Sequence, residues 1–273
     1  MLTRVIVAVI AIPILFLIIL FAPLWALGAV VGIIAACSAW EFLRCAENDL
    51  PVRIRIVAAA CGFLIPFCSA LFPGGRVCET ALFFLFGYMF CELMLSFRKE
   101  TTMDFESVAV VLLGGAVMPI LLGSIVRLGA REHGSVYVLL PFVASFSCDA
   151  GAYFSGLAFG RHKMAPRLSP HKTIEGSIGG FLAAIVLMLA YGLILRVAKY
   201  DVNLAVMAVY GFLGALACEL GDLSFSAVKR LCGVKDYGTM IPGHGGMLDR
   251  FDSMFWTAAF LELLISWVPA ITK

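Results

Sequence analysis

Long apolar runs dominate this chain and constrain its fold more than any other feature. A helix needs roughly 20 predominantly apolar residues to cross the hydrocarbon core of a bilayer. We count nine such runs, at residues 5–22, 24–43, 54–72, 77–97, 105–127, 135–159, 173–197, 202–221 and 250–269. Only 14% of the residues are charged, against about 25% in soluble domains. The sequence therefore predicts an all-α polytopic membrane protein of about nine transmembrane helices.

The boundary between the first two runs is the least certain part of this prediction. Only Ala22 and Pro23 separate them, so a tight hairpin and one kinked element both remain open. No linker or soluble segment divides the rest of the chain, which predicts a single membrane domain, residues 1–273. Within it, 1–134 supply N-terminal spans and 135–273 carry spans broken by polar segments. Glycine pairs inside spans, such as Gly114–Gly115 and Gly179–Gly180, predict close helix packing.

Basic residues are distributed unevenly between the loops. If the nine spans hold, 14 of the 20 lysines and arginines fall on one side of the membrane, which the positive-inside rule makes cytoplasmic. The formal net charge is only +2, so no nucleic-acid partner is expected. The nine cysteines show no Cys-x-x-Cys spacing and mostly lie in apolar runs, so neither a zinc site nor a disulfide framework is predicted.

Residues 222–252 form a polar stretch between two apolar runs, on the predicted cytoplasmic side. Asp222, Ser226 and Lys229 follow i, i+4, i+7 spacing, which puts them on one face of a short helix that Gly233 can end. The segment Gly238–Gly246 is glycine-rich, so its backbone can approach a ligand closely. The segment therefore predicts a polar site facing the cytoplasm.

Asp249 and Asp252 lie at the start of the last apolar run, one helical turn apart. Hard cations such as Mg²⁺ prefer carboxylate oxygens, but acids also favour helix N-termini through capping and the helix dipole. Asp222 lies at the same predicted depth, where a further carboxylate is costly unless it is paired or bound to metal. The basic residues nearby could likewise bind phosphates or simply anchor the chain at the cytoplasmic side of the membrane.

A second polar segment, Ser169–Gly176, opens the run at 173–197. Its simplest interpretation is an N-cap by Thr173 with Lys172 exposed; a Ser-x-x-Lys nucleophile also fits by spacing, but no Lys-Thr-Gly follows. Inside the run at 135–159, Asp149 is an intramembrane acid and thus a functional candidate. The acids of other runs receive no role: Glu41, Glu92, Glu219 and Glu262.

Together these motifs resemble the phosphatidate cytidylyltransferase (CDP-diacylglycerol synthase) family. The signature of that family is matched without a gap by Ser226, Lys229, Arg230, Lys235, Asp236, Ile241, Pro242, Gly243, His244, Gly245, Gly246, Asp249, Arg250 and Asp252. Two further family blocks are matched by Asp149, Ala152, Tyr153, Gly156, Gly160 and Arg161, and by Ser169, Pro170, Lys172, Thr173, Glu175 and Gly176. The motifs cover about residues 140–269.

The resemblance implies that CTP and phosphatidate react to give CDP-diacylglycerol and diphosphate with the help of Mg²⁺. The lipid phosphate would attack the α-phosphorus of CTP in line, which requires mainly positioning and charge neutralisation. The implied metal ligands are Asp222, Asp249 and Asp252, and a second, monovalent cation stays open. The implied catalytic set is Asp222, Lys229, Arg230, Lys235, Asp236, His244, Asp249, Arg250 and Asp252, and the implied substrate-binding set is Asp149, Tyr153, Ser169, Lys172, Thr173, Glu175 and Ser226. His244 would either donate to the leaving diphosphate or shape the loop.

The same resemblance implies phospholipid biosynthesis in the bacterial cytoplasmic (inner) membrane, with the active site facing the cytoplasm and a homodimer as the expected assembly. Two alternatives remain. A CTP-dependent polyprenol kinase would share the activated-lipid chemistry, and a secondary transporter would share the many spans, broken glycine-rich helices and intramembrane acids.

Overall fold

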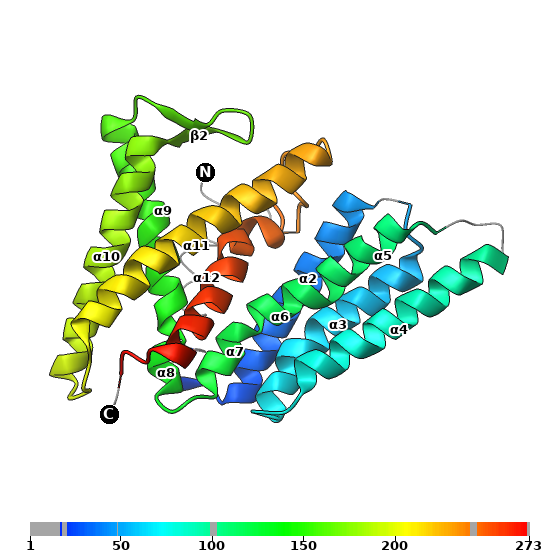
Figure 1. Ribbon diagram of the computed structural model, residues 1–273, viewed down its shortest axis with the longest axis horizontal. Helices are drawn as coiled ribbons and strands as arrows, with labels where there is room; N and C mark the ends of the chain where they lie inside the picture. The colour runs from blue at the N-terminus through cyan, green and yellow to red at the C-terminus, as the bar shows by residue number, and fades with distance from the viewer. Residues whose placement is uncertain (1–16, 18–20, 48, 99–102, 241–244, 272–273) are drawn as a thin grey trace. The chain divides into compact units, whose positions relative to one another are not determined.

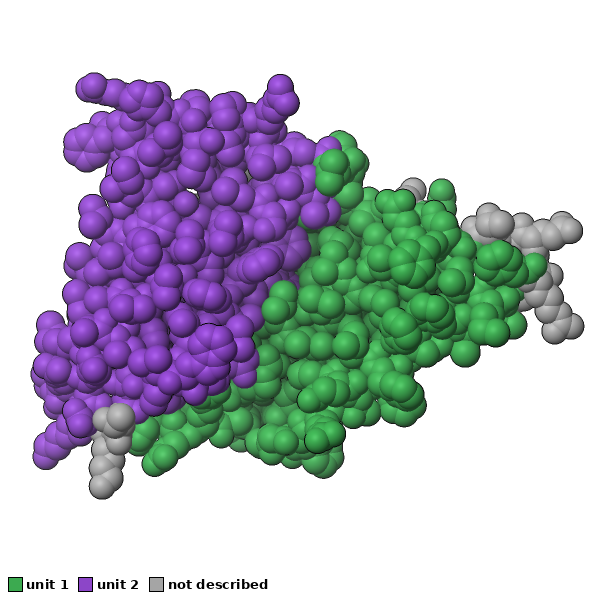
Figure 2. Space-filling model, viewed as in Figure 1, with its two compact units in different colours: residues 1–135, 231–251 green, residues 136–230, 252–273 purple. Residues whose placement is uncertain are grey.

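The computed structural model describes the chain except for residues 1–16, 18–20, 48, 99–102, 241–244 and 272–273. The described chain forms two compact units, residues 1–135 with 231–251 and residues 136–230 with 252–273 (Figure 2). The segment 231–251 thus groups with the N-terminal spans, although the last helix continues from it into the second unit.

Three long helices and one interrupted helix make up most of the first unit (Figure 1). They are α2 (Leu24–Ala46), α3 (Val52–Leu71), α4 (Val77–Arg98), and the series α5 (Phe105–Leu112), η1 (Leu113–Val117), α6 (Met118–Leu122) and α7 (Ser124–Gly129). Helices α2 and α3 pack so closely that a Cβ atom on Gly32 would lie 2.7 Å from the Phe63 carbonyl oxygen. The η1 segment is a π-helical turn, and Gly115 within it lies against Ala58 of α3.

The second unit is built on α9 (Leu139–Phe159), α10 (Ile174–Val197), α11 (Leu204–Leu231) and most of α12 (Leu248–Trp267). The short α8 (Gly134–Tyr137) spans the boundary between the units. Between α9 and α10 the chain forms a two-stranded antiparallel hairpin of β1 (Lys163–Ala165) and β2 (Ser169–Thr173) (Figure 1).

Small residues let the helices of this unit approach closely. A Cβ atom on Gly151 of α9 would lie 2.8 Å from the Gly179 carbonyl oxygen of α10, and Gly211 of α11 lies equally close to Ala184. Gly180 and Gly214 are in similar contact with α9. The prediction that glycines mediate helix packing is therefore confirmed.

Seven described segments are long and apolar enough to cross a bilayer: Leu24–Ala46, Val52–Leu71, Val77–Phe97, Phe105–Gly129, Gly134–Phe159, Ile174–Val197 and Leu204–Leu231. They confirm the all-α polytopic prediction. The run at 5–22 lies almost entirely outside the described residues. The run at 250–269 is helical as α12, which is not among the seven and begins with Asp249, Arg250 and Asp252.

The separate short helix expected at Asp222–Leu231 is wrong, because these residues continue α11. No helix breaker lies between Asp222 and Leu231, and Phe225 packs against Phe255 of α12 with ring centroids 5.5 Å apart. Gly233 follows the helix with a φ of 70°, as a C-terminal glycine should. The polar end of α11 is therefore rigidly continuous with its apolar part.

Candidate active site

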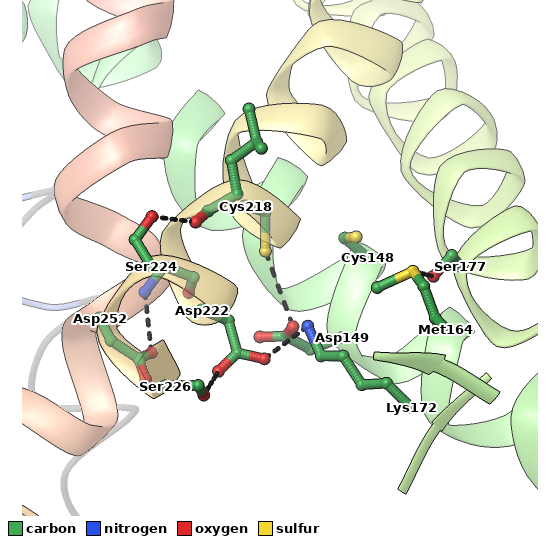
Figure 3. A network of polar contacts seen from close by, with 12 residues as sticks. Cys148, Asp149, Met164, Lys172, Ser177, Cys218, Asp222, Ser224, Ser226 and Asp252 are labelled. Carbon is green, nitrogen blue, oxygen red and sulfur yellow. Dashed lines mark hydrogen bonds and ion pairs between the residues drawn. The ribbon is translucent and has the colours of Figure 1, made fainter. Parts of the chain in front are cut away.

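An ion pair joins the two polar segments of the second unit (Figure 3). The Lys172 Nζ atom of β2 lies 2.5 Å from Asp222 Oδ2 of α11, and the two side chains are only 24% and 29% exposed. Burial by itself lowers the pKa of Lys172, but the Asp222 carboxylate outweighs it and holds that pKa above its ordinary value. Lys172 is therefore a fixed positive charge and not the exposed lysine of the simpler interpretation.

The hairpin that carries Lys172 is fixed at its base and near its tip. Thr173 caps α10 by accepting a hydrogen bond from the Gly176 N–H, so the predicted N-cap is confirmed. Glu175 accepts hydrogen bonds from the N–H groups of Arg161 and His162 at 3.1 and 3.2 Å. Arg230 of α11 donates to the Leu168 carbonyl oxygen at 3.2 Å. These contacts place the hairpin over the polar end of α11.

Two further carboxylates of this unit lie near the ion pair. Asp149 of α9 accepts a weak hydrogen bond from the Cys218 thiol at 3.6 Å, and Asp252 of α12 is buried, with Lys229 Nζ 3.9 Å from its Oδ2 atom. Asp222 interacts electrostatically with both acids and accepts a hydrogen bond from the Ser226 hydroxyl at 3.4 Å. We call these residues the polar cluster: Asp149, Lys172, Asp222, Ser226, Lys229 and Asp252.

The polar cluster holds three carboxyl groups and two ammonium groups, which is one more acidic than basic group. Repulsion between Asp222 and its two acidic neighbours would be relieved by a cation, and carboxylate oxygens are the donors that Mg²⁺ prefers. The described residues contain no group of three or more His, Cys, Asp or Glu side chains arranged to hold a metal ion. Mg²⁺ usually takes only one or two carboxylates and completes its shell with water and substrate phosphates, so the cluster fits it in charge and chemistry.

An open cavity of about 460 Å³ adjoins the polar cluster. Asp149, Lys172 and Thr173 line its polar part, and Tyr153 and Leu157 line an apolar part. A pocket with these two characters suits an amphiphilic ligand that carries a phosphate.

The glycine-rich segment belongs to the first unit, where Asp249 closes it. The Asp249 Oδ2 atom accepts hydrogen bonds from the N–H groups of Tyr237 and Gly246, at 2.9 and 3.1 Å. Gly245 has a φ of 86°, a conformation that favours glycine. Asp249 thus joins Tyr237 to Gly246. We call residues 237–246 the glycine loop, of which the structure describes 237–240 and 245–246. The interpretation of Asp249 as a plain N-terminal acid is therefore too simple.

The predicted site residues are divided between the two units. The first unit holds Lys235, Asp236, Asp249 and Arg250, and the second holds Asp149, Tyr153, Ser169, Lys172, Thr173, Glu175, Asp222, Ser226, Lys229, Arg230 and Asp252. The implied metal ligands fall in both. Lys235, Asp236 and Arg250 are exposed, and His244 lies outside the described residues.

Two features of these units were not predicted from sequence. The hairpin was expected only as a polar loop, since its strands are short and contain Pro170. Glu41 of α2 was given no role, although the structure places its carboxylate against the glycine loop. Its charge within an apolar run was the one available signal.

A comparison with known families decides the assignment. A family model described as "Cytidylyltransferase family" matches residues 2–268. The chain belongs to the cytidylyltransferase family. The match extends the resemblance, which rested on residues 140–269, over the N-terminal spans as well. Glu41 and α2 therefore lie within the residues that the family model matches.

Curated relatives of this cytidylyltransferase-family chain carry a more specific name. Proteins named phosphatidate cytidylyltransferase are 40% identical over 135 residues in Staphylococcus aureus (strain COL), 33% over 192 in Staphylococcus haemolyticus (strain JCSC1435) and 32% over 209 in Bacillus subtilis (strain 168). These matches cover 50%, 70% and 75% of this chain, and 51%, 72% and 74% of the respective relatives. The chain thus spans about half the length of the Staphylococcus aureus relative, and more of the other two.

Proposed function

We propose that this protein is a phosphatidate cytidylyltransferase, which converts CTP and phosphatidate to CDP-diacylglycerol and diphosphate in phospholipid biosynthesis. The observation that carries the proposal is the polar cluster, in which Lys172 and Asp222 are paired at the end of an apolar helix. Charged groups in such a place are costly and are retained mainly for function. The family match and the names of the relatives support the same reaction.

In this mechanism a phosphate oxygen of phosphatidate attacks the α-phosphorus of CTP. A new P–O bond forms, the bond from the α-phosphorus to the oxygen that bridges to the β-phosphorus breaks, and diphosphate leaves with that electron pair. The nucleophile is already an anion near neutral pH, so no protein nucleophile is needed. The protein has to bring two polyanions together and neutralise them.

The polar cluster and the glycine loop would divide this work. Lys172, at the polar part of the 460 Å³ cavity, would bind the phosphate of phosphatidate, with the acyl chains toward Tyr153 and Leu157. The backbone of the glycine loop would bind the phosphates of CTP, and Lys229 and Arg230 of α11 would neutralise phosphate charge. Lys235, Arg250 and His244 stay candidates for binding phosphates, and Asp236 stays a catalytic candidate. Ser169, Thr173, Glu175 and Ser226 would hold the hairpin and Asp222 in place.

The cofactor proposed is Mg²⁺, held by Asp222, Asp249 and Asp252, with a second, monovalent cation as an open addition. It would supply positive charge against the phosphates during transfer. The lipid substrate implies a multi-pass protein whose site faces the cytoplasm, where CTP is found, in the bacterial inner membrane. A homodimer is the assembly proposed.

Labelled CTP distinguishes this reaction from its rivals. Purified protein in detergent micelles would be incubated with Mg²⁺, phosphatidate, a polyprenol and CTP labelled at either the α- or the γ-phosphorus. Cytidylyl transfer puts the α-label into lipid and releases the γ-label as diphosphate. A kinase would instead put the γ-label into polyprenol, and a transporter would label no lipid. Folded wild-type protein that leaves α-label out of the lipid fraction would overturn the proposal.

Site variants test the residues. Asp222→Asn and Lys172→Met should each lower turnover at least 100-fold, as removal of charge stabilisation at a transferring phosphate does. Glu79→Gln, an acid in the first turn of α4 outside the polar cluster, is the matched control and should retain wild-type turnover.

A further inference from the structure

Glu41 of α2 is a buried acid that the reaction above does not use. It is only 3% exposed, and its Oε2 atom accepts a hydrogen bond from the Leu248 N–H at 2.8 Å. Its Oε1 atom is buried without a hydrogen-bond donor among the described residues. A buried carboxylate with so few partners costs stability, so its presence calls for a compensating role.

The carboxylate of Glu41 touches both ends of the glycine loop. A Cβ atom on Gly246 would lie 2.5 Å from Glu41 Oε2, and one on Gly238 would lie 2.9 Å from Glu41 Cδ. A Cβ atom at either position would require the Glu41 carboxylate to shift. The two glycines therefore allow the present close approach of Glu41 to the backbone at residues 238 and 246.

The neighbour of Glu41 strengthens the same contact. Phe42 packs against Tyr237 at the start of the loop, with ring centroids 6.5 Å apart. Gly114 of the π-helical turn has no side chain, and the Phe42 ring lies in the space beside it. A Cβ atom on Gly114 would lie 2.8 Å from that ring. Packing within the first unit thus fixes both α2 residues that contact the loop.

Two carboxylates consequently hold the glycine loop from two helices. Asp249 accepts hydrogen bonds from the N–H groups of Tyr237 and Gly246, and Glu41 accepts one from the N–H group of Leu248, two residues after the loop. Three of the backbone donors at the loop ends are satisfied in this way. The described ends of the glycine loop, at residues 237–238 and 245–246, are therefore held by these two carboxylates.

We propose that Glu41 is a positioning residue that holds the glycine loop in the conformation in which it binds the phosphates of CTP. The proposal rests on the proposed function, since it assigns CTP to this loop. It gives an N-terminal span a specific part in the reaction. It also separates Glu41 from residues that contact the substrate, because Glu41 would act through Gly238, Gly246 and the Leu248 N–H group.

Steady-state kinetics of Glu41→Ala and Glu41→Gln test the proposal. Loss of a hydrogen bond to a charged group lowers a rate or binding constant by roughly 10- to 100-fold. We expect Glu41→Ala to lower kcat/KM for CTP by that factor while the KM for phosphatidate changes less than about 3-fold. Glu41→Gln keeps an acceptor oxygen for the Leu248 N–H and should restore most of the loss.

The matched control is Glu92 of α4, a second buried acid of the first unit, 8% exposed and hydrogen-bonded to Arg53 at 2.7 Å. Glu92→Ala should lower the melting temperature without changing the kinetic constants for CTP. Wild-type kinetic constants in Glu41→Ala would overturn the positioning role. So would a Glu41→Ala variant that loses kcat/KM for CTP and for phosphatidate equally, if Glu92→Ala loses them in the same way.

Hydrogen–deuterium exchange tests the same role without substrate. The Leu248 amide should exchange at least 10-fold faster in Glu41→Ala than in the wild type, and at the wild-type rate in Glu92→Ala, because the Glu41 carboxylate accepts its hydrogen bond. An unchanged exchange rate in Glu41→Ala would refute the inference even if the chain transfers no cytidylyl group. A faster rate with an inactive wild type would refute only the proposed function.

Discussion

The Lys172–Asp222 ion pair should make a measurable contribution to the stability of the second unit. The two atoms lie 2.5 Å apart and both side chains are mostly shielded from water, at 24% and 29% exposure. A hydrogen bond to a charged group contributes about 1.5–3 kcal/mol, whereas pairs in full contact with water contribute about 0.2–1 kcal/mol. We therefore expect a coupling energy of about 2 kcal/mol between the two side chains.

A double-mutant cycle measures this coupling. Lys172→Met, Asp222→Asn and the double variant would be unfolded reversibly in mixed micelles, without CTP or Mg²⁺, and followed by tryptophan fluorescence. The control cycle uses the pair Arg53–Glu92, which is 2.7 Å apart but has the Arg53 side chain 55% exposed, so its coupling should be smaller. A coupling below about 0.5 kcal/mol for Lys172 and Asp222, or one no larger than the control, would refute the reasoning.

The same pair makes a prediction about pH. The pKa of Lys172 is raised above its ordinary value of 10.5, because the attraction of Asp222 outweighs burial. The stabilisation by the ammonium is thus complete below pH 10.5 and is lost only as the pH rises through the raised pKa. The coupling energy should consequently be constant from about pH 6 to pH 9. A decline within that range would show that Lys172 loses its proton there.

Three further predictions follow from other parts of the chain. Gly151→Ala should destabilise the α9–α10 contact by about 1–3 kcal/mol, whereas Gly87→Ala, with nothing within 4 Å of its added Cβ atom, should not; melting temperatures in detergent compare them. Asp104→Ala should lower the melting temperature at neutral pH, because the Asp104 side chain caps α5 by accepting a hydrogen bond from the Ser107 N–H. The hydrogen bonds from Ser107 hold the pKa of Asp104 below 3.8, so the difference in melting temperature from the wild type should vanish only below that pH. Removing Mg²⁺ with EDTA should abolish cytidylyl transfer and excess Mg²⁺ should restore it, unless the polar cluster acts without a cation.

Local patterns in the sequence predicted much of the second unit. The apolar runs located the helices, Thr173 located the start of α10, and Gly233 located the end of α11, because each signal depends on residues close in the chain. The hairpin was missed, since a strand of three residues carries too little pattern to distinguish it from a loop. A helix was expected from Asp222 onward, but its continuity with the apolar run before it was missed, because the polar residues end that run in sequence, whereas Phe225 packs on α12 in the structure.

Motif matching found the residue types of the site but could not supply their contacts. It selected Lys172 and Asp222 as separate candidates, and the structure shows that they form an ion pair between residues 50 positions apart. It assigned no role to Glu41, because a single acid in an apolar run has the same appearance whether it faces lipid, another helix or a loop. Only the fold brings Leu248, 207 residues away, to that carboxylate.

By itself, the sequence determined the class of the protein and most of its helices, and it supplied the candidate residues for phosphate and metal binding. These features depend on composition and on the spacing of residues along the chain, and both are the same in the folded and the unfolded protein. Tertiary structure decided which charges are partnered: Lys172 with Asp222, Asp249 with the loop amides, and Glu41 with Leu248. The physical reason is that a buried charge is stabilised by whatever packing brings within hydrogen-bonding distance, and that distance is independent of separation in sequence.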